Sequence, residues 1–323
     1  MIVDLPSTDT SAVNRKMVDL RESAGAVALG RVLTLVISTE DGPEAEAAIQ
    51  AANDASREHP CRVLVLARGV RRAASRLDAQ IRIGGDAGAS EVIVLRMYGP
   101  LADQGGSIVV PLLLPDAPIV AWWPGEPPPA PGEDPIGAVA ARRITDVGSS
   151  RAPAKALARL GTHYSPGDTD LAWSRVTSWR ALLTSALDEP PYEPVISAAV
   201  DGVADSPSAD LIAGWLSSRL GVPVTRSVVD VPGGNIGAVR IERASGTVEL
   251  RRLDGKNARL SQPGQPDRRV ALARRTAREC LAEELRRLDP DETFHEALVA
   301  VPNARSGSKG RSRRPSSSSK ASA

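Results

Sequence analysis

The sequence predicts an α/β protein: an N-terminal doubly wound, mostly parallel sheet domain followed by a C-terminal α/β (α+β-like) domain with antiparallel strands. The apolar runs Arg31–Ser38 and Arg62–Ala67 enclose a helix that Pro43 opens, a spacing typical of a right-handed βαβ unit. The run Ala117–Ala121 ends at two tryptophans and turn residues, and it fits a strand buried on both faces of a parallel sheet. Farther on, Ala244-Ser245-Gly246 joins two strand patterns in the manner of a hairpin.

The first domain is expected to span residues 1–165, with strands and helices alternating along the chain. The proline-dense residues 126–135 predict an extended surface loop. In chain order, the further elements expected here are a helix at Asn14–Glu22, the Pro43 helix to about Arg57, strands at Gln80–Ile83 and Glu91–Tyr98, a helix at Leu101–Val109, one or two helical turns at Ile136–Ala141 and a helix at Ala152–Leu160.

The second domain is expected to span residues 166–300. Its strongest helical pattern, Thr169–Leu187, repeats apolar side chains every three or four residues, and Ser206-Pro207 and Gly221 are typical start and stop signals of a helix. In chain order, the further elements expected are a strand at Val195–Val203, a helix at Ser208–Leu220, strands at Val222–Asp230, Ala238–Arg243 and Thr247–Leu253, and helices at Arg269–Leu288 and Asp291–Leu298.

The charges are unevenly distributed along the chain. The formal net charge of the 323 residues is +1, but residues 301–323 carry six Lys/Arg and no acidic residue. The rest therefore holds 34 basic and 39 acidic side chains, a balance of −5, which predicts no nucleic-acid surface. The Ser-, Arg-, Lys- and Gly-rich tail cannot bury a core and is expected to be a disordered basic tail.

Neither a membrane protein nor a secreted protein is indicated. No apolar run approaches transmembrane length, and Met1–Ala12 has no signal-peptide pattern. Cys61 and Cys280 are far apart and not in metal-binding spacing, so we expect two small buried hydrophobes rather than a disulfide. A cytoplasmic protein is the expectation.

The motifs of catalysis are missing from the sequence. The histidines are His59, His163 and His295, without a carboxylate or Cys at ligand spacing, and surface or helix-end roles are expected for them. No GxSxG, HExxH or GxxxxGK[ST] occurs. The glycine-rich stretches 84–88 and 232–235 lack a strand-to-helix context and predict turns. We therefore expect no enzyme, no cofactor and no metal.

Tryptophan and arginine form the remaining clusters. Trp122 and Trp123 are adjacent, so on a strand they face opposite sides. Each of the two side chains therefore either packs into a hydrophobic core or faces a cleft or a partner protein. Arg suits carboxylates and phosphates, and Trp with Arg is typical of binding hot spots. A solvated helix face with an internal Arg–Asp pair is the alternative. The candidates for a partner interface or anion site near the domain junction are Trp122, Trp123, Arg142, Arg143, Asp146, Trp173, Arg175, Trp179 and Arg180.

Several blocks of the sequence resemble the actinobacterial OpcA proteins, which are glucose-6-phosphate dehydrogenase assembly proteins. The resemblance covers most of residues 1–300, and its WWP and RRITD motifs are fairly specific. The blocks are Arg96–Pro128, Asp134–Asp146, Asp170–Leu183, Leu211–Gly221 and Cys280–Leu298.

The resemblance implies a non-catalytic protein that binds glucose-6-phosphate dehydrogenase and favours its active oligomer, as an allosteric activator. It would thereby support the pentose phosphate pathway and NADPH supply. An alternative is a sugar-phosphate-binding enzyme or sensor, such as a 6-phosphogluconolactonase-like hydrolase, with the arginines as a phosphate clamp and His163 as the base. A sugar-phosphate ligand is thus a further expectation, whereas a nucleic-acid or membrane partner is not expected.

Overall fold

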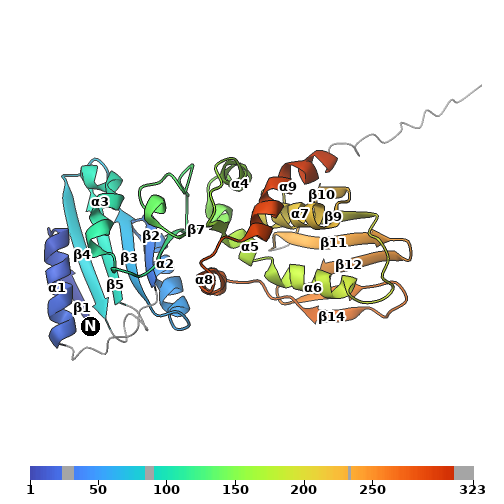
Figure 1. Ribbon diagram of the computed structural model, residues 1–323, viewed down its shortest axis with the longest axis horizontal. Coiled ribbons are helices and arrows are strands. Elements are labelled where there is room, and N and C mark those ends of the chain that lie inside the picture. The colour runs from blue at the N-terminus through green and yellow to red at the C-terminus, as the bar shows by residue number, and fades with distance from the viewer. Residues whose placement is uncertain (24–32, 84–90, 232–233, 309–323) are drawn as a thin grey trace, which may run out of the picture. The chain divides into compact units, whose positions relative to one another are not determined.

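A computed structural model (Figure 1) describes residues 1–23, 33–83, 91–231 and 234–308. The chain divides into two compact units. Unit 1 contains Met1–Thr177 and Arg274–His295, and unit 2 contains Ser178–Ala273 and the residues from Glu296 onward.

Unit 1 is built on an eight-stranded sheet in the order β1-β4-β5-β3-β2-β6-β7-β8. The six strands from β5 to β8 in that order are parallel, while β4 is antiparallel to β5 and β1 to β4. This confirms the predicted mostly parallel, doubly wound sheet. The strands are β1 (Ile2–Leu5), β2 (Leu33–Glu40), β3 (Cys61–Arg68), β4 (Arg76–Ile83), β5 (Glu91–Tyr98), β6 (Ile119–Trp123), β7 (Arg142–Thr145) and β8 (Asp168–Asp170).

The direction of strand addition reverses between β2 and β6. From β2 the chain first adds β3 and β5 on one side, and it later adds β6, β7 and β8 on the other side. A doubly wound sheet reverses in this way at its topological switch point, where loops at the carboxyl ends of the two strands diverge and leave a crevice. The crevice here is therefore expected beyond Glu40 and Trp123.

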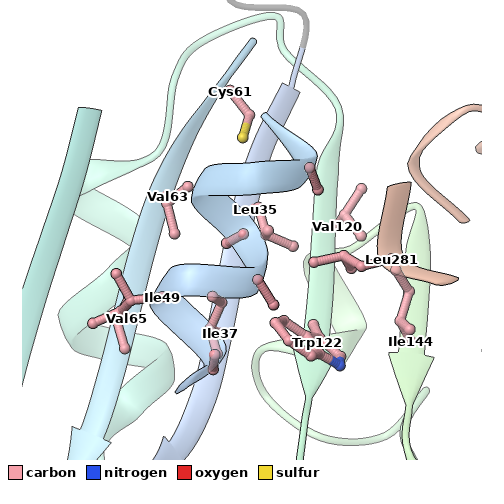
Figure 2. Packing of buried hydrophobic residues seen from close by; sticks show 14 of the residues in the cluster. Leu35, Ile37, Ile49, Cys61, Val63, Val65, Val120, Trp122, Ile144 and Leu281 are labelled. Carbon is pink, nitrogen blue, oxygen red and sulfur yellow. The ribbon is translucent and has the colours of Figure 1, made fainter. Parts of the chain in front are cut away.

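Helices cover the sheet of unit 1 and create two hydrophobic cores. One core, the α2/α8 core, lies under α2 and α8 (Figure 2). The other, the α1/α3 core, includes side chains of α1 and α3. The helices of unit 1 are α1 (Thr10–Ser23), α2 (Pro43–Ala55), α3 (Gly105–Val109), α4 (Pro153–Thr162), α5 (Leu171–Ser174) and α8 (Ala277–Leu285), with short 3₁₀ turns at η2 (Gly99–Asp103), η3 (Val110–Leu112), η4 (Gly137–Val139) and η5 (Val147–Ser149).

The two adjacent tryptophans lie on opposite faces of β6, as the strand geometry predicts. Trp122 belongs to the α2/α8 core and Trp123 to the α1/α3 core, and both are at most 2% exposed. The two cysteines are also buried and free, which confirms the expectation for them. Burial raises the pKa of the Cys280 thiol to about 12, so this thiol is protonated at neutral pH.

Unit 2 contains a six-stranded sheet in the order β10-β9-β11-β12-β13-β14, parallel only between β10 and β9. The predicted hairpin joins β11 and β12, and Ser206 and Gly221 cap α7 at its two ends as predicted. The elements are α6 (Thr177–Leu187), β9 (Ser197–Gly202), α7 (Pro207–Leu220), β10 (Val224–Val228), β11 (Ile236–Arg243), β12 (Gly246–Arg252), β13 (Asn257–Ser261), β14 (Arg268–Ala271) and α9 (Glu292–Ser308), the first turn of which belongs to unit 1.

Several of the expected helices are wrong in extent. The expected helix Leu101–Val109 is the 3₁₀ turn η2 followed by the short α3. Residues 168–170 are strand β8, and α5 and α6 follow as separate helices. The expected helix Arg269–Leu288 is instead β14, paired with β13, and then α8. Thr276 and Glu279 form a reciprocal capping box at the start of α8, and this T-x-x-E signal is visible in the sequence.

Three further segments differ from the expectation. Arg142–Thr145, where no strand was expected, is a buried parallel strand, and β13 was not expected either. Helix α9 continues to Ser308, into the tail that was expected to be disordered from residue 301. The rest of that tail, the glycine turn expected at 84–88 and residues 232–233 of the other expected turn lie outside the described residues. The expected domain boundaries, 1–165 and 166–300, stay a prediction.

Candidate functional site

A cleft of about 290 Å³ opens at the switch point of unit 1. It lies between one side of α2, the segments that follow β6 and β7, and the start of α8. All of its lining belongs to unit 1. The lining residues are Glu44, Ala47, Ala48, Ala51, Trp122, Pro124, Gly125, Asp146, Ser149, Arg175 and Ala277.

The Trp122 side chain lines this cleft, but its indole N–H is buried and is not exposed to the cleft. Its Nε1 has no hydrogen-bond partner among the described residues. Leaving a buried donor unpaired costs about 1–3 kcal/mol. In Figure 2 the nitrogen lies at the end of the ring on the side of Ile144, the residue of β7 paired with Trp122.

A bidentate ion pair forms the polar wall of the cleft. Arg175 donates from Nη1 and Nη2 to the two carboxylate oxygens of Asp146, at 2.6 and 2.7 Å. Ser149 Oγ donates to Asp146 Oδ2 at 3.2 Å. Burial disfavours the charge of Arg175, but the bonds and charge of Asp146 outweigh this and raise the arginine's pKa. Both terminal nitrogens of the guanidinium therefore serve Asp146.

Behind this wall, Asp170 is completely enclosed. Its carboxylate accepts from Thr145 Oγ1 at 2.6 Å and from the backbone N–H groups of Val147 and Ala172 at 2.8 Å each. Burial and the nearby negative charge of Asp146 nevertheless raise the pKa of Asp170 to about 7. Asp170 thus caps α5 and ties β7 to β8 with a carboxyl group that can take up a proton near neutrality.

The adjacent arginines on β7 point to opposite faces, and both are engaged inside unit 1. Arg142 donates to Glu284 of α8 and, at 2.7 Å, to the carbonyl of Asp289. Arg143 donates to Asp168 and to the carbonyls of Ala140 and Pro166. Both side chains are less than 10% exposed. Their guanidinium groups stabilise the connection of β7, β8 and α8, and they offer an external anion little access.

The remaining candidates divide between the two units. Trp173, in unit 1, is buried and donates from Nε1 to Asp291 at 2.8 Å. Trp179 is buried in unit 2, with the guanidinium of Arg252 5.4 Å from its ring centroid, and Arg180 is half-buried on the same helix. Of the nine candidates, the cleft brings together Trp122, Asp146 and Arg175. A role for the others in a partner interface stays a prediction.

Sequence reasoning missed the carboxylates that organise this region. Asp168 and Asp170 flank Thr169 on β8, and the alternation of polar residues there did not indicate a strand. Glu284 lies within an otherwise apolar helix stripe and accepts from both Arg142 and Ser174. A buried carboxylate in an apolar stripe generally requires a cationic partner, and this was the available signal.

The start of α2 is acidic. Pro43 occupies the first helical turn, together with Glu44 and Glu46. Asp41 accepts from Arg96 at 3.2 Å, and Glu46 accepts from Arg82 at 2.8 and 3.0 Å. In the classical dinucleotide fold the corresponding turn is glycine-rich and holds a pyrophosphate at the helix N-terminus. The negative side chains here oppose such a ligand.

The described residues contain neither a metal-ligand cluster nor a membrane-spanning helix. No group of three or more His, Cys, Asp or Glu in the described part of the chain could hold a metal ion. Within the same residues, no helix has the length and apolarity required to cross a bilayer.

Comparison with known proteins gives two adjoining family matches. Residues 52–162 match the family model described as the glucose-6-phosphate dehydrogenase subunit N-terminal domain, and residues 166–298 match the C-terminal domain of the same subunit. No curated protein matches the chain.

Two solved structures are similar over most of the chain. One is titled glucose-6-phosphate 1-dehydrogenase from Mycobacterium avium, with 14% identity, a TM-score of 0.39, and coverage of 88% of this chain and 93% of that one. The other is GenD2 from gentamicin A biosynthesis in complex with NAD, with 12% identity, a TM-score of 0.38, and coverage of 89% and 97%. At these scores the structures carry no functional argument.

Proposed function

This chain belongs to the OpcA family of glucose-6-phosphate dehydrogenase subunits, and we propose that it is a non-catalytic partner that binds this dehydrogenase and favours its active oligomer. The observation that supports the proposal is the pair of family matches, which together run from residue 52 to residue 298 with a gap of only residues 163–165. In this role the chain would act in the cytoplasm and support the pentose phosphate pathway and NADPH supply.

The proposed mechanism is thermodynamic linkage. A protein that binds the active oligomer more tightly than the inactive form shifts the population by its difference in affinity. A tenfold preference corresponds to about 1.4 kcal/mol. This mechanism requires an exposed surface and no bond-making side chain.

The outer face of the unit 2 sheet is the surface we propose for this contact. Arg251, Arg259 and Arg269 are register partners on β12, β13 and β14, and their side chains are 42%, 43% and 67% exposed. Like charges directly opposite on neighbouring strands are destabilising, whereas arginine is enriched in protein interfaces. A partner with carboxylates facing this row would relieve the repulsion.

Each arginine of the row already has a carboxylate within 4 Å. The pairs are Arg251–Glu249 at 2.7 Å, Arg259–Asp267 at 3.6 Å and Arg269–Asp254 at 3.4 Å. The last two distances are long for charge-assisted hydrogen bonds, so these guanidinium groups retain donors for a partner.

The test is to mix the chain with its cognate dehydrogenase and to measure molar mass by light scattering together with turnover. A larger complex and a higher activity are expected. The variant Arg251→Glu/Arg269→Glu should weaken the complex at least tenfold, whereas Arg71→Glu, a reversal at a 61% exposed arginine of unit 1, should not.

The partnership with the dehydrogenase and the surface proposed for it can be rejected independently. No complex and no change in turnover would reject the partnership itself. A complex that tolerates both reversals equally would reject the surface and leave the partnership in place.

The alternative, a sugar-phosphate-binding enzyme or sensor, has no specific observation in its favour. Arg142 and Arg143 hold internal carboxylates and carbonyls, and His163 is an exposed residue at the C-terminal end of α4. The two arginines that would bind a phosphate beside His163 are therefore already occupied by acceptors inside unit 1.

A further inference from the structure

A second cleft of unit 1, with a volume of about 190 Å³, opens at the carboxyl ends of β2, β3 and β5. Ser38, Leu66 and Met97 line it from these three strands, and the start of α3 and the segment that precedes η4 complete the lining. It shares no lining residue with the cleft at the switch point. Because open parallel sheets bind ligands beyond the carboxyl ends of their strands, the position is suitable for a ligand, and the chemistry of the lining decides which.

The alternation of side chains along β2 and β3 turns Ser38 and Arg68 toward this cleft. Val36 belongs to the α1/α3 core and Ile37 to the α2/α8 core, so Ser38, two residues after Val36, lies on the α1/α3 face of the sheet. Leu66 belongs to the α1/α3 core, which places Arg68 on the same face. Both side chains line the cleft.

Ser38 and Arg68 also have hydrogen-bond donors that no described residue uses. Ser38 is 6% exposed, and its hydroxyl has no partner among the described residues. Its oxygen, unlike that of Thr34, is not fully enclosed, so a ligand in the cleft can reach it. Arg68 contacts Glu40 through Nε at 3.2 Å, whereas its Nη1 and Nη2 have no partner in the described part of the chain. Polar groups of this kind are normally paired with protein, water or ligand.

Two carboxylates complete the polar lining. Asp134 Oδ1 accepts from the backbone N–H groups of Ile136 and Gly137 at 2.9 and 3.4 Å, while its Oδ2 accepts from none of the described residues. Asp103 pairs with Arg71 at 3.2 Å, with both side chains 61% exposed. The lining therefore combines one guanidinium with two carboxylates, a set that opposes a phosphate and suits a ligand that carries both signs of charge.

We propose that this cleft binds a small apolar α-amino acid as its zwitterion. Arg68 and Ser38 donate to the carboxylate of the ligand, because the planar guanidinium matches a carboxylate and the hydroxyl supplies a further donor. Asp134 Oδ2 accepts from the ammonium group, and Asp103 adds negative charge on the same side of the charge balance. Binding uses the donors and the acceptor that the chain itself leaves unpaired.

The size and the apolar part of the cleft limit the side chain of the ligand. Leu66, Met97 and Ile136 contribute apolar surface, which suits an aliphatic side chain. The volume of about 190 Å³ is below the roughly 300–1,000 Å³ of pockets for drug-sized ligands. The ligand is therefore an amino acid of the size of alanine, valine or leucine rather than a nucleotide.

The test is titration calorimetry of the full chain with L-alanine, L-valine and L-leucine. At least one of them should bind with a Kd tighter than about 1 mM. Each is compared with the acid that lacks the ammonium group and the amine that lacks the carboxylate, which for L-valine are 3-methylbutanoate and 2-methylpropylamine. Both analogues should bind at least tenfold more weakly, since each leaves one charged group of the cleft without its partner.

Three results would overturn the proposal. The first is that none of the three amino acids binds. The second is that an analogue with a single charge binds as tightly as its parent amino acid. The third is that glucose or inorganic phosphate, used as negative probes, binds more tightly than every amino acid.

Two variants with matched controls connect the binding to this cleft. Arg68→Met keeps the aliphatic stem and removes the guanidinium, so the affinity for the amino acid should fall at least tenfold. Its control is Arg57→Met, at a 73% exposed arginine outside the lining. Asp134→Asn removes the negative charge that faces the ammonium group and should weaken binding to a similar extent, whereas Asp116→Asn, at an exposed position outside the lining, should not.

A third variant guards against a folding artefact. The Arg68–Glu40 pair is partly exposed, so its loss should leave the melting temperature close to that of the wild type. If Arg68→Met nevertheless fails to fold, Ser38→Ala decides, because it removes only the hydroxyl and should lower the affinity about tenfold. Binding that survives both Ser38→Ala and Asp134→Asn unchanged would place the ligand elsewhere and refute the assignment. The inference does not depend on the dehydrogenase partnership, because all measurements are made on the isolated chain.

Discussion

Asp146 favours the charged form of one neighbouring side chain, Arg175, and opposes the charged form of another, Asp170. It holds Arg175 in a bidentate pair, and its negative charge opposes ionisation of the enclosed Asp170. The hydrogen bonds from Thr145, Val147 and Ala172 favour the charged form of Asp170, but burial outweighs them. The stability of this region therefore depends on pH.

We predict that Asp170→Asn flattens the pH dependence of stability between about pH 4 and pH 7. The pKa of Asp170 is raised to about 7 in the folded state, against about 3.9 when unfolded. Between these values the unfolded chain binds fewer protons, so the wild-type free energy of unfolding decreases as the pH rises. Over the whole window this one group removes up to about 4 kcal/mol.

The measurement is urea denaturation of wild type and Asp170→Asn at several pH values. The variant need not be as stable as the wild type at any single pH, because the prediction concerns the difference between the two curves. That difference should move in favour of the Asp170→Asn variant as the pH rises from about 4 to about 7. Parallel curves would show that Asp170 ionises normally in the folded chain.

At the scale of elements, α7 and α9 approach one another closely in unit 2. A Cβ built on Gly214 of α7 would lie 2.1 Å from the carbonyl oxygen of Ala297 in α9. Real Cβ atoms do not come so close to a backbone atom, so any larger residue at this position forces the helices apart. The glycine, a poor helix former in general, is required here by packing.

We predict that Gly214→Ala destabilises the protein by about 2–4 kcal/mol, despite the gain in helix propensity. Gly255→Ala is the matched control, since nothing lies within 4 Å of a Cβ built there. Thermal denaturation of both variants checks the prediction. A variant Gly214→Ala as stable as the control would mean that the two helices separate without cost.

Elements with a strong apolar pattern could be predicted from the sequence, and elements held by polar pairing could not. β2, β3 and β5 are continuous apolar runs, and α7 has both a cap and a stop residue, so their position follows from local signals. β7 and β8 contain arginine, threonine and aspartate, and they become strands because Arg142, Arg143 and Asp170 find partners elsewhere in the chain. Hydrogen-bond partners that lie far away in the sequence cannot be inferred from a local sequence pattern.

The same distinction explains the candidate site. The opposite orientation of Trp122 and Trp123 follows from strand geometry alone. The partner of Asp146 does not: it is Arg175, and not one of its sequence neighbours Arg142 and Arg143. The alanines of α2 and Ala277 of α8 both line the cleft, and only the tertiary fold brings them together. Composition could not reveal that α8 belongs to the first unit, since about a hundred residues of unit 2 precede it.

At the scale of the whole molecule, the chain passes between the two compact units at residues 177/178, 273/274 and 295/296. Unit 1 is therefore incomplete until α8 has been made. Cys280, Leu281 and Leu285 of α8 are buried in the α2/α8 core. Burial of each leucine contributes about 1.5–3 kcal/mol, a large share of the stability of a typical domain.

We predict that a fragment of residues 1–177 is poorly folded by itself and that a peptide of residues 274–295 restores it. The peptide supplies α8 with its capping box and covers the apolar side of α2. Near-ultraviolet circular dichroism, which reports on the packing of Trp122, Trp123 and Trp173, measures the effect. A peptide with Leu281→Asp and Leu285→Asp is the control and should not restore packing.

A fragment that is fully folded without the peptide would contradict this prediction. It would also show that the boundaries expected from the sequence, near residue 165, mark a unit that can fold independently of α8.

The interleaved path of the chain also limits how relatives can exchange parts by recombination. A single crossover near the boundary of the two family matches would combine the first sheet of one parent with the α8 of the other, so that Arg142 and Glu284 would descend from different genes. A chimera that keeps both units intact requires breakpoints at all three crossings, so that α8 is inherited with the sheet it covers and the part of α9 from Glu296 onward with α7.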